Sequence, residues 1–241
     1  MLCTNGPQPA GRLSVVVPTV NEGALIAGLL ADLRRKVPGA EIIVVDGGSD
    51  DQTVALARQG ADLVLASPRG RARQMNAGAA VASGEIFWFL HADSLVPADP
   101  LGSIARVLDD PGIVGGCFRL KFPRREWVYR ISDRLGNMAV DLFQIALGDH
   151  GIFCRREAFV RVGSYPEVPL MEDAELYRRL RRVGRMRQLS EHIVSSPRRY
   201  EQLGPVRTTV VYLFILILYL AKVPPRGLFA VYRKLTRPRK S

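Results

Sequence analysis

The fold class is indicated most clearly by the stretch Leu13-Ser-Val-Val-Val-Pro18-Thr-Val-Asn21-Glu22. It begins with an apolar run of strand length that ends at a proline, and its polar residues then open a helical pattern. Similar runs, rich in Val, Ile, Leu and Phe, follow at 42–46, 63–66 and 86–90. Segments with helical spacing separate the runs, at 22–36, 51–59 and 71–82. The runs are typical of strands buried on both faces. The alternation predicts an α/β protein with a mostly parallel sheet covered by helices, whose ligands gather at the carboxyl ends of the strands.

The regular alternation weakens after residue 110. Gly115-Gly116, Pro123 and the segment 127–147 predict a strand and then one or two helices that do not continue the repeat, and 172–183 predicts a further helix. We therefore expect a different surface in the second half. The predicted organisation is a flexible N-terminus, a domain with two halves, and C-terminal helices, at 1–12, 13–200 (13–110 and 111–200) and 201–241.

The composition excludes disordered and fibrous classes, because 47% of the 241 residues are hydrophobic. Thirty-four Lys plus Arg against 23 Asp plus Glu give a formal charge of +11, which indicates an anionic partner. Residues 222–241 carry seven of these basic side chains and no acid, so the rest of the chain has 27 basic and 23 acidic residues, or +4. A nucleic-acid partner is disfavoured, because aromatic residues do not interleave with the basic residues of the body.

The cysteines and the N-terminus favour a cytoplasmic protein. Cys3, Cys117 and Cys154 are odd in number and lack CxxC spacing, which argues against a disulfide framework or a zinc ribbon. The first residues show neither a basic segment nor an apolar run of signal-peptide length.

The segment 206–223 is the most apolar stretch of the chain. Its uncharged centre would be about 18 Å long as a helix, against a hydrocarbon core of about 30 Å, so its length is marginal for spanning a membrane. Pro224-Pro225 must end this helix. Beyond them, Leu228, Phe229, Tyr232 and Leu235 recur at helical spacing among basic residues, a pattern typical of a helix lying on an anionic membrane surface. The alternative is a buried helix or dimer contact with a solvated basic end.

Polar residues follow the first two predicted strands at the edge where ligands are expected. Pro18, Thr19, Asn21 and Glu22 follow the first strand, and Asp46, Gly47 and Ser49 follow the second. Asp46 comes directly after four apolar residues, which favours a functional role. For Ser49 and Asp50, capping of the next helix is an equally good interpretation.

The third and fourth loops indicate a phosphate and a cation. GxGxxG and GxxxxGK[ST] motifs are absent, which disfavours dinucleotide and P-loop sites. Arg69, Arg71 and Arg73 stand where a helix begins, a position unfavourable for cations unless an anion such as a diphosphate binds there. His91-Ala92-Asp93 follows the fourth strand, and a carboxylate there suits a divalent cation that bridges phosphate oxygens, the alternative being a turn or cap aspartate.

Two later acidic motifs complete the candidate residues. Gly148-Asp149-His150-Gly151 ends the segment 119–150, in which we expect acceptor specificity. Glu172-Asp173 stands at a predicted helix start, where two acids can simply favour the helix dipole. In a site that holds a sugar nucleotide, one of them can act as general base for an acceptor hydroxyl.

Taken in order, these motifs resemble family 2 glycosyltransferases with the GT-A fold. The resemblance covers about 13–200 and rests on the ordered set Pro18-x-x-Asn21-Glu22, Asp46-Gly-x-Ser49-x-Asp51-x-Thr53, Arg71 to Gly78, Asp93 and Glu172-Asp173. Small bacterial members with His-Ala-Asp and Gly-Asp-(His or Gln)-Gly are similar in length and end in a comparable apolar and basic tail. The substrate does not follow from this resemblance.

The resemblance implies roles for the matching positions. Asp93 would hold Mg²⁺ or Mn²⁺ against the diphosphate, and Asp173, beside Glu172, matches the base of an inverting transfer. The nucleotide-sugar donor, expected to be a UDP-sugar, would contact Pro18, Thr19, Asn21, Glu22, Asp46, Gly47, Ser49, Arg71, Asn76, Ala92 and Asp93. Asp149 and His150 would lie on the side of a small or lipid-linked acceptor.

Two departures qualify the implied activity. His91-Ala92-Asp93 replaces the usual Asp-x-Asp, which leaves one firm carboxylate ligand for a metal. Ser196-Pro197-Arg198-Arg199-Tyr200 stands where processive synthases have Gln-x-x-Arg-Trp, so we expect transfer of a single sugar. The alternative function is a non-catalytic, membrane-associated module that binds a nucleotide sugar. For the transferase we expect a cytoplasmic location, on the inner face of the membrane.

Overall fold

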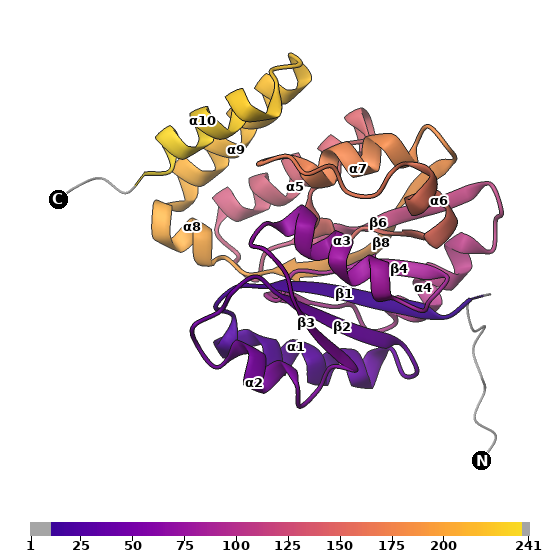
Figure 1. The fold of residues 1–241 in the computed structure, drawn as a ribbon. Helices are drawn as coiled ribbons and strands as arrows, with labels where there is room; N and C mark the ends of the chain where they lie inside the picture. The colour runs from indigo at the N-terminus through magenta and orange to yellow at the C-terminus, as the bar shows by residue number, and fades with distance from the viewer. Residues whose placement is uncertain (1–10, 238–241) are drawn as a thin grey trace.

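A computed structural model describes residues 11–237 of the chain. A sheet of eight strands in the order β3-β2-β1-β4-β7-β6-β8-β5 runs through it (Figure 1). The strands are β1 (Leu13–Thr19), β2 (Glu41–Asp46), β3 (Leu63–Ala66), β4 (Ile86–Phe89), β5 (Ser94–Leu95), β6 (Ile113–Lys121), β7 (Phe153–Arg155) and β8 (Arg185–Ser195). The helices are α1 (Gly23–Lys36), α2 (Thr53–Ala57), α3 (Arg71–Val81), α4 (Pro100–Leu108), α5 (Trp127–Phe143), α6 (Arg156–Arg161), α7 (Glu172–Leu180), α8 (Arg198–Leu203), α9 (Pro205–Leu220) and α10 (Pro225–Leu235), with a 3₁₀ turn η1 (Gly148–His150).

The first four long strands form the parallel half of the sheet, as predicted. β1 pairs with β2 on one side and with β4 on the other, and β3 pairs with β2. Thr19 lies opposite Asp46, so the polar residues after these two strands meet at one edge of the sheet. The expectation that 63–66 is buried on both faces is wrong, because β3 is an edge strand and its two end residues are exposed.

The second half continues the same sheet with mixed strand directions. β7 pairs antiparallel with both β4 and β6, β8 runs parallel to β6, and β5 pairs antiparallel with β8. The predicted strand after residue 110 is β6, and a single helix, α5, follows where one or two were expected. α5 ends at Phe143, and the next residue, Gln144, has a positive φ of 57° that breaks the helical path.

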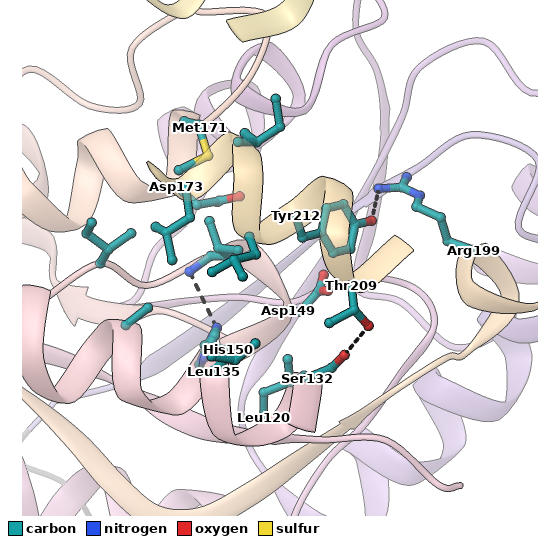
Figure 2. A pocket seen from close by; sticks show the side chains of 18 of the residues that line it. Leu120, Ser132, Leu135, Asp149, His150, Met171, Asp173, Arg199, Thr209 and Tyr212 are labelled. Carbon is teal, nitrogen blue, oxygen red and sulfur yellow. Dashed lines mark hydrogen bonds between the residues drawn. The ribbon is translucent and has the colours of Figure 1, made fainter. Parts of the chain in front are cut away.

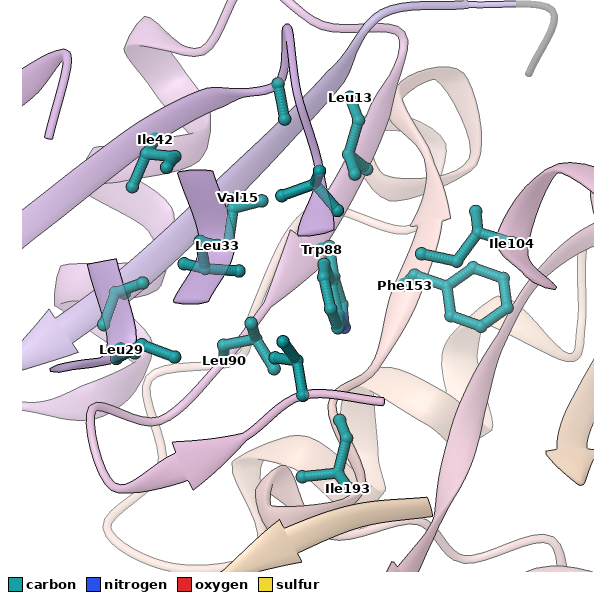
Figure 3. Packing of buried hydrophobic residues seen from close by; sticks show 14 of the residues in the cluster. Leu13, Val15, Leu29, Leu33, Ile42, Trp88, Leu90, Ile104, Phe153 and Ile193 are labelled. Carbon is teal, nitrogen blue, oxygen red and sulfur yellow. The ribbon is translucent and has the colours of Figure 1, made fainter. Parts of the chain in front are cut away.

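Alternate residues of the strands bury side chains in two cores, one on each face of the sheet. On one face Val15, Ile42 and Trp88 pack against α1 and α4 (Figure 3). On the other face Val16, Ile43 and Phe87 pack against α3, α6 and α7. The strands are therefore buried between two helical layers, and the loops at the strand ends remain available for a ligand.

The helix predicted over 51–59 is shorter than expected, because the Asp51 side chain accepts hydrogen bonds from the backbone and hydroxyl of Thr53 and α2 begins only there. Neither Ser49 nor Asp50 caps α2, since its N-cap residue is Gln52. The helix predicted over 172–183 ends earlier, at Leu180.

The C-terminal helices α9 and α10 form an antiparallel pair at one end of the molecule (Figure 1). Val211 and Ile215 of α9 and Leu228 of α10 are buried in a small core with Ile145 and Met171 of the body. Within residues 11–237, no helix combines the length and apolarity needed to cross a membrane. Of the predicted flexible N-terminus, residues 1–10 lie outside the described part, as do Arg239 and Lys240 of the basic tail.

Candidate active site

The loops after β1 and β2 are tied together by backbone and side-chain hydrogen bonds. The backbone N–H of Asn21 donates to Oγ of Ser49, and the backbone N–H of Asp50 donates to Oδ1 of Asn21. The first turn of α1 is satisfied in the same way, since the N–H of Glu22 donates to Oγ1 of Thr53. The polar residues of the second loop thus hold the first loop in place.

Asp46 and Gln74 support the same edge from within. Asp46 is 6% exposed, and its carboxylate accepts hydrogen bonds from Ser49, Gly48 and Thr19. Burial raises the pKa of Asp46, but these hydrogen bonds outweigh it and hold the pKa below its ordinary value. Nε2 of Gln74 donates to the carbonyls of Thr19 and Val45 at 2.9 and 2.8 Å. Both side chains therefore rigidify the strand ends.

A polar cavity of about 770 Å³ opens at this edge. Its lining contains several arginines and three carboxylates, so it suits an anion accompanied by a cation. The charged residues of the lining are Arg69, Arg71, Arg198, Arg199, Glu22, Asp93 and Asp149.

Arg198 connects the two carboxylates at the mouth of the polar cavity. Its guanidinium lies 2.8 Å from Glu22 and 3.5 Å from Asp93. The described residues contain no group of three His, Cys, Asp or Glu side chains able to hold a metal ion. Asp93 nevertheless fits a metal carried by a diphosphate, because Mg²⁺ sites commonly take one or two protein carboxylates and complete their shell with phosphate oxygens and water.

His91 and Asp149 form a hydrogen-bonded pair on the wall of the polar cavity. Nδ1 of His91 lies 3.0 Å from Oδ1 of Asp149. Burial lowers the pKa of His91, but the hydrogen bond and charge of Asp149 outweigh it and raise the pKa overall. The same contact holds the pKa of Asp149 well below its usual range despite burial. Nδ1 of His91 is therefore hydrogen-bonded to Asp149.

Glu172 and Asp173 begin α7 and are both almost fully buried. Nε of Arg71 lies 2.6 Å from Oε1 of Glu172, so the arginine at the start of α3 is paired within the protein. Burial and the neighbouring charge of Asp173 raise the pKa of Glu172. A Cβ at Gly148 would collide with Nε2 of His91 and lie 2.6 Å from Oδ2 of Asp173, so the two side chains converge there and leave room only for glycine.

An apolar chamber of about 140 Å³ adjoins the polar cavity and is enclosed by α5, the segment before β7, and α9. Figure 2 shows Asp149, Asp173 and His150 around it, with Tyr212 and Arg199 on a neighbouring wall. The two cavities share six lining residues, which are Arg71, Phe122, Asp149, Arg199, Tyr200 and Tyr212. The site is therefore a polar and an apolar compartment with a common wall.

The structure brings most of the residues predicted from the sequence to these two compartments. The polar cavity is lined by Pro18, Thr19, Asn21, Glu22, Arg71, Ala92, Asp93 and Asp149, and the apolar chamber by Asp149, His150 and Asp173. Glu172 reaches the site through Arg71. Asp46, Gly47 and Ser49 do not line either compartment, because they are turned into the loop that supports the first strand.

Asn76 also departs from its predicted place. Its side-chain amide exchanges two hydrogen bonds with the backbone of Tyr165, both of 2.9 Å, and it lines neither compartment. Instead of the expected contact with the donor, Asn76 therefore links α3 to the segment before α7.

Sequence reasoning missed several lining residues. The sequence marks Arg198 and Arg199 only as part of a segment that replaces another motif, and it places Tyr212 in the apolar stretch expected at a membrane. Nη1 of Arg199 donates to the hydroxyl of Tyr212 at 3.0 Å, which joins α8 and α9 above the site. The sequence signal for Tyr212 is a tyrosine inside a strongly apolar run, since a buried phenol usually finds a hydrogen-bond partner.

Comparison with known proteins identifies the class and then the family. The fold is shared with solved transferases: a mannosyltransferase from Pyrobaculum calidifontis, in complex with GDP-Man and Mn²⁺, has a TM-score of 0.69 at 21% identity over 95% of this chain and 72% of that one. Glucosyl-3-phosphoglycerate synthase from Mycobacterium tuberculosis, in complex with Mn²⁺ and UDP, has a TM-score of 0.63 at 22% identity over 89% and 81%. These likenesses confirm the predicted GT-A fold.

Residues 14–164 match the family described as "Glycosyl transferase family 2", and the chain belongs to that family. PGL/p-HBAD biosynthesis glycosyltransferases of Mycobacterium bovis and Mycobacterium tuberculosis are 30% identical to it over 169 residues. The match covers 65% of this chain and 64% of the length of those relatives.

Proposed function

We propose that this chain is an inverting glycosyltransferase that moves a single sugar from a nucleotide-sugar donor, a UDP-sugar, to a hydroxyl of a small or lipid-linked acceptor. The observation that carries the proposal is the common wall between the two compartments. The polar cavity has the arginines and Asp93 that a nucleoside diphosphate requires, and the adjoining chamber contains Asp173. Family membership and the titles of the two solved neighbours, which contain nucleotide or nucleotide sugar and Mn²⁺, support the same activity.

In this mechanism Asp173 accepts the proton of the acceptor hydroxyl. The acceptor oxygen forms its bond to the anomeric carbon while the bond from that carbon to the diphosphate oxygen breaks, and the configuration inverts. Arg71 and Arg199 balance the charge that develops on the leaving diphosphate. Mn²⁺ or Mg²⁺, held by Asp93 together with the diphosphate, would supply further charge neutralisation. Glu172 positions Arg71 through their ion pair.

We also propose that the domain at 13–200 acts at a membrane, on its cytoplasmic face, with 201–241 as the attachment. An exposed apolar stripe on α9 supports this, formed by Val206, Val210, Leu213, Ile217 and Leu220. α5, which contacts α9, carries a second exposed stripe with Trp127, Ile131, Met138 and Leu142. Exposed apolar stripes beside the basic residues of α10 suit an anionic lipid surface.

The proposed activity is tested by screening nucleotide sugars with Mn²⁺ for thermal stabilisation and then for transfer. A donor present at 100 times its Kd should add about 2.7 kcal/mol to the free energy of unfolding. The donor identified in this way should release its nucleoside diphosphate when an acceptor is added. Binding without release across the acceptor panel would favour the non-catalytic module instead.

A further inference from the structure

The apolar chamber has the size and lining of a site for one ring. Leu135 and Ala139 of α5 and Ile215 and Leu216 of α9 are among its lining residues, and its volume is about 140 Å³. An aliphatic cavity of about 150 Å³ in a protein interior binds benzene. A six-membered aromatic ring or a branched alkyl group of similar size matches this volume, and the polar lining residues Asp149, His150 and Asp173 can bind the hydroxyl that such a group carries.

His150 adds a hydrogen-bond donor to the apolar wall. Its side chain is fully buried, and burial lowers its pKa, so the ring is neutral at pH 7. Nδ1 accepts a hydrogen bond of 3.4 Å from the backbone N–H of Leu147, which leaves the proton on Nε2. Nε2 has no partner of full hydrogen-bond geometry within residues 11–237, although the backbone of Gly136 lies close to it, and His150 is one of the residues that line the chamber. A ligand oxygen would give this buried donor a better partner.

The carboxylate of Asp173 lines the same chamber, although it is absent from the lining of the polar cavity. The proposed base is therefore on the apolar side of the common wall, and the proposed metal ligand Asp93 is on the polar side. This division places a bound hydroxyl beside the base while the diphosphate remains among the arginines.

We propose that the apolar chamber is the acceptor site and that the acceptor is a phenol-type alcohol, in which a ring-sized apolar group carries the hydroxyl. This inference rests on the proposed glycosyltransferase activity and specifies its acceptor class. The hydroxyl proton passes to Asp173, the new carbon–oxygen bond forms at the anomeric carbon, and the nucleoside diphosphate leaves with the electron pair of the broken bond. Nε2 of His150 donates to an oxygen of the bound acceptor.

Gly136 offers a way to fill the chamber from within a helix. It lies in α5 and lines the chamber, and a Cβ built there makes only ordinary contacts, at 3.5 Å from Leu120 and 3.8 Å from His150. Gly136→Ala adds one methyl group to the space and Gly136→Leu fills much more of it. Gly28→Leu is the matched control, because Gly28 is an exposed glycine in α1 with nothing within 4 Å of a built Cβ.

The experiment measures phenol binding by ligand-observed NMR without any nucleotide sugar, and the affinity for UDP with Mn²⁺ separately. We expect phenol to bind the wild type, Gly136→Ala to weaken binding by a few fold, and Gly136→Leu to weaken it by about tenfold or more. Gly28→Leu should bind phenol as the wild type does. The affinity for UDP should stay within about twofold in every variant, which also shows that each variant is folded.

Phenol binding that is absent, or equal in Gly136→Leu and the wild type, would overturn the chamber assignment. If a nucleotide sugar is then transferred to glycerol or methyl glucoside, the proposed activity stands and only its acceptor class fails. If phenol binding depends on Gly136 but no nucleotide sugar binds, the chamber assignment stands and the proposed activity fails.

Discussion

The polar cavity and the apolar chamber share a wall but are built in opposite ways. The polar cavity is formed largely by the loops after β1, β3 and β4, with Arg198 and Arg199 added from α8. The chamber is formed mainly by α5, the segment before β7, and α9, which are separated along the chain. With the proposed roles, donor recognition would belong to the common scaffold of the fold, and acceptor recognition would depend on helices outside it.

Removing the proposed base should have the largest effect, because it should lower the transfer rate and leave donor binding unchanged. Asp173→Asn keeps the size of the side chain but cannot accept the proton, so the transfer rate should fall by about 10²–10⁴-fold. The Kd for UDP with Mn²⁺ should not change, because Asp173 does not line the polar cavity. Transfer assays measure the rate, and calorimetric titration measures the Kd for UDP. Full transfer by this variant would remove Asp173 as the base.

Removing the proposed metal ligand from the polar cavity should weaken donor binding and leave phenol binding unchanged. Asp93→Asn, or an excess of EDTA on the wild type, should weaken donor binding and lower transfer by roughly 100-fold or more. Phenol binding in the chamber should be unaffected. Asp50→Asn is the control for the substitution, because Asp50 is exposed and outside both linings. Undiminished turnover in EDTA would contradict the role of Asp93 as a metal ligand.

Substitutions on the exposed face of α9 test whether this helix, which also lines the chamber, contacts a membrane. Val210 and Ile217 are 59% and 52% exposed, so aspartate at both positions should leave the fold intact and lower partition onto phosphatidylglycerol vesicles by about tenfold. Val160→Asp is the matched control, since Val160 is 65% exposed on α6. Deleting the C-terminal helices is a poorer test, because Val211, Ile215 and Leu228 form a core with the body. Equal partition of the double variant and the control would exclude α9 as the contact.

Asp133 should give the smallest effect, a pH dependence of stability on the chamber side. Burial raises the pKa of Asp133 to about 6, although the backbone N–H of Phe122 donates to its carboxylate. The raised value means that the stability contributed by the protonated form is present below about pH 4 and is lost as pH rises through 6. Asp133→Asn keeps the acceptor for Phe122 and avoids that loss, so it should be more stable at pH 7 by up to about 1 kcal/mol, because the side chain is only half-buried.

Urea unfolding at pH 3.5 and pH 7 checks this prediction. The variant and the wild type should differ at the higher pH and converge at the lower one, and Asp50→Asn should show no such change. A constant difference at both values would show that the effect has another cause.

The donor side of the site could be predicted in large part from the sequence, for a physical reason. Thr19, Asn21, Asp46 and Asp93 lie at or just after the ends of apolar runs, and parallel strands bring their carboxyl ends to one edge. The side chains' directions could not be predicted in the same way. Asp46 turns inward because Ser49, Gly48 and Thr19 all donate to it, and that arrangement depends on the path of the loop.

The βαβ half of the sheet, the order of the polar loops and the family can be predicted from the sequence, because local periodicity and strand ends are encoded by residues close together in the chain. The packing of distant segments is needed to show that Asp173 lies on the apolar side, that Arg71 pairs with Glu172, and that Tyr212 of an apolar helix reaches the site. These contacts join residues far apart in sequence, with Arg71 and Glu172 about a hundred positions distant, and their distance and direction follow only from the packing of helices on the finished sheet.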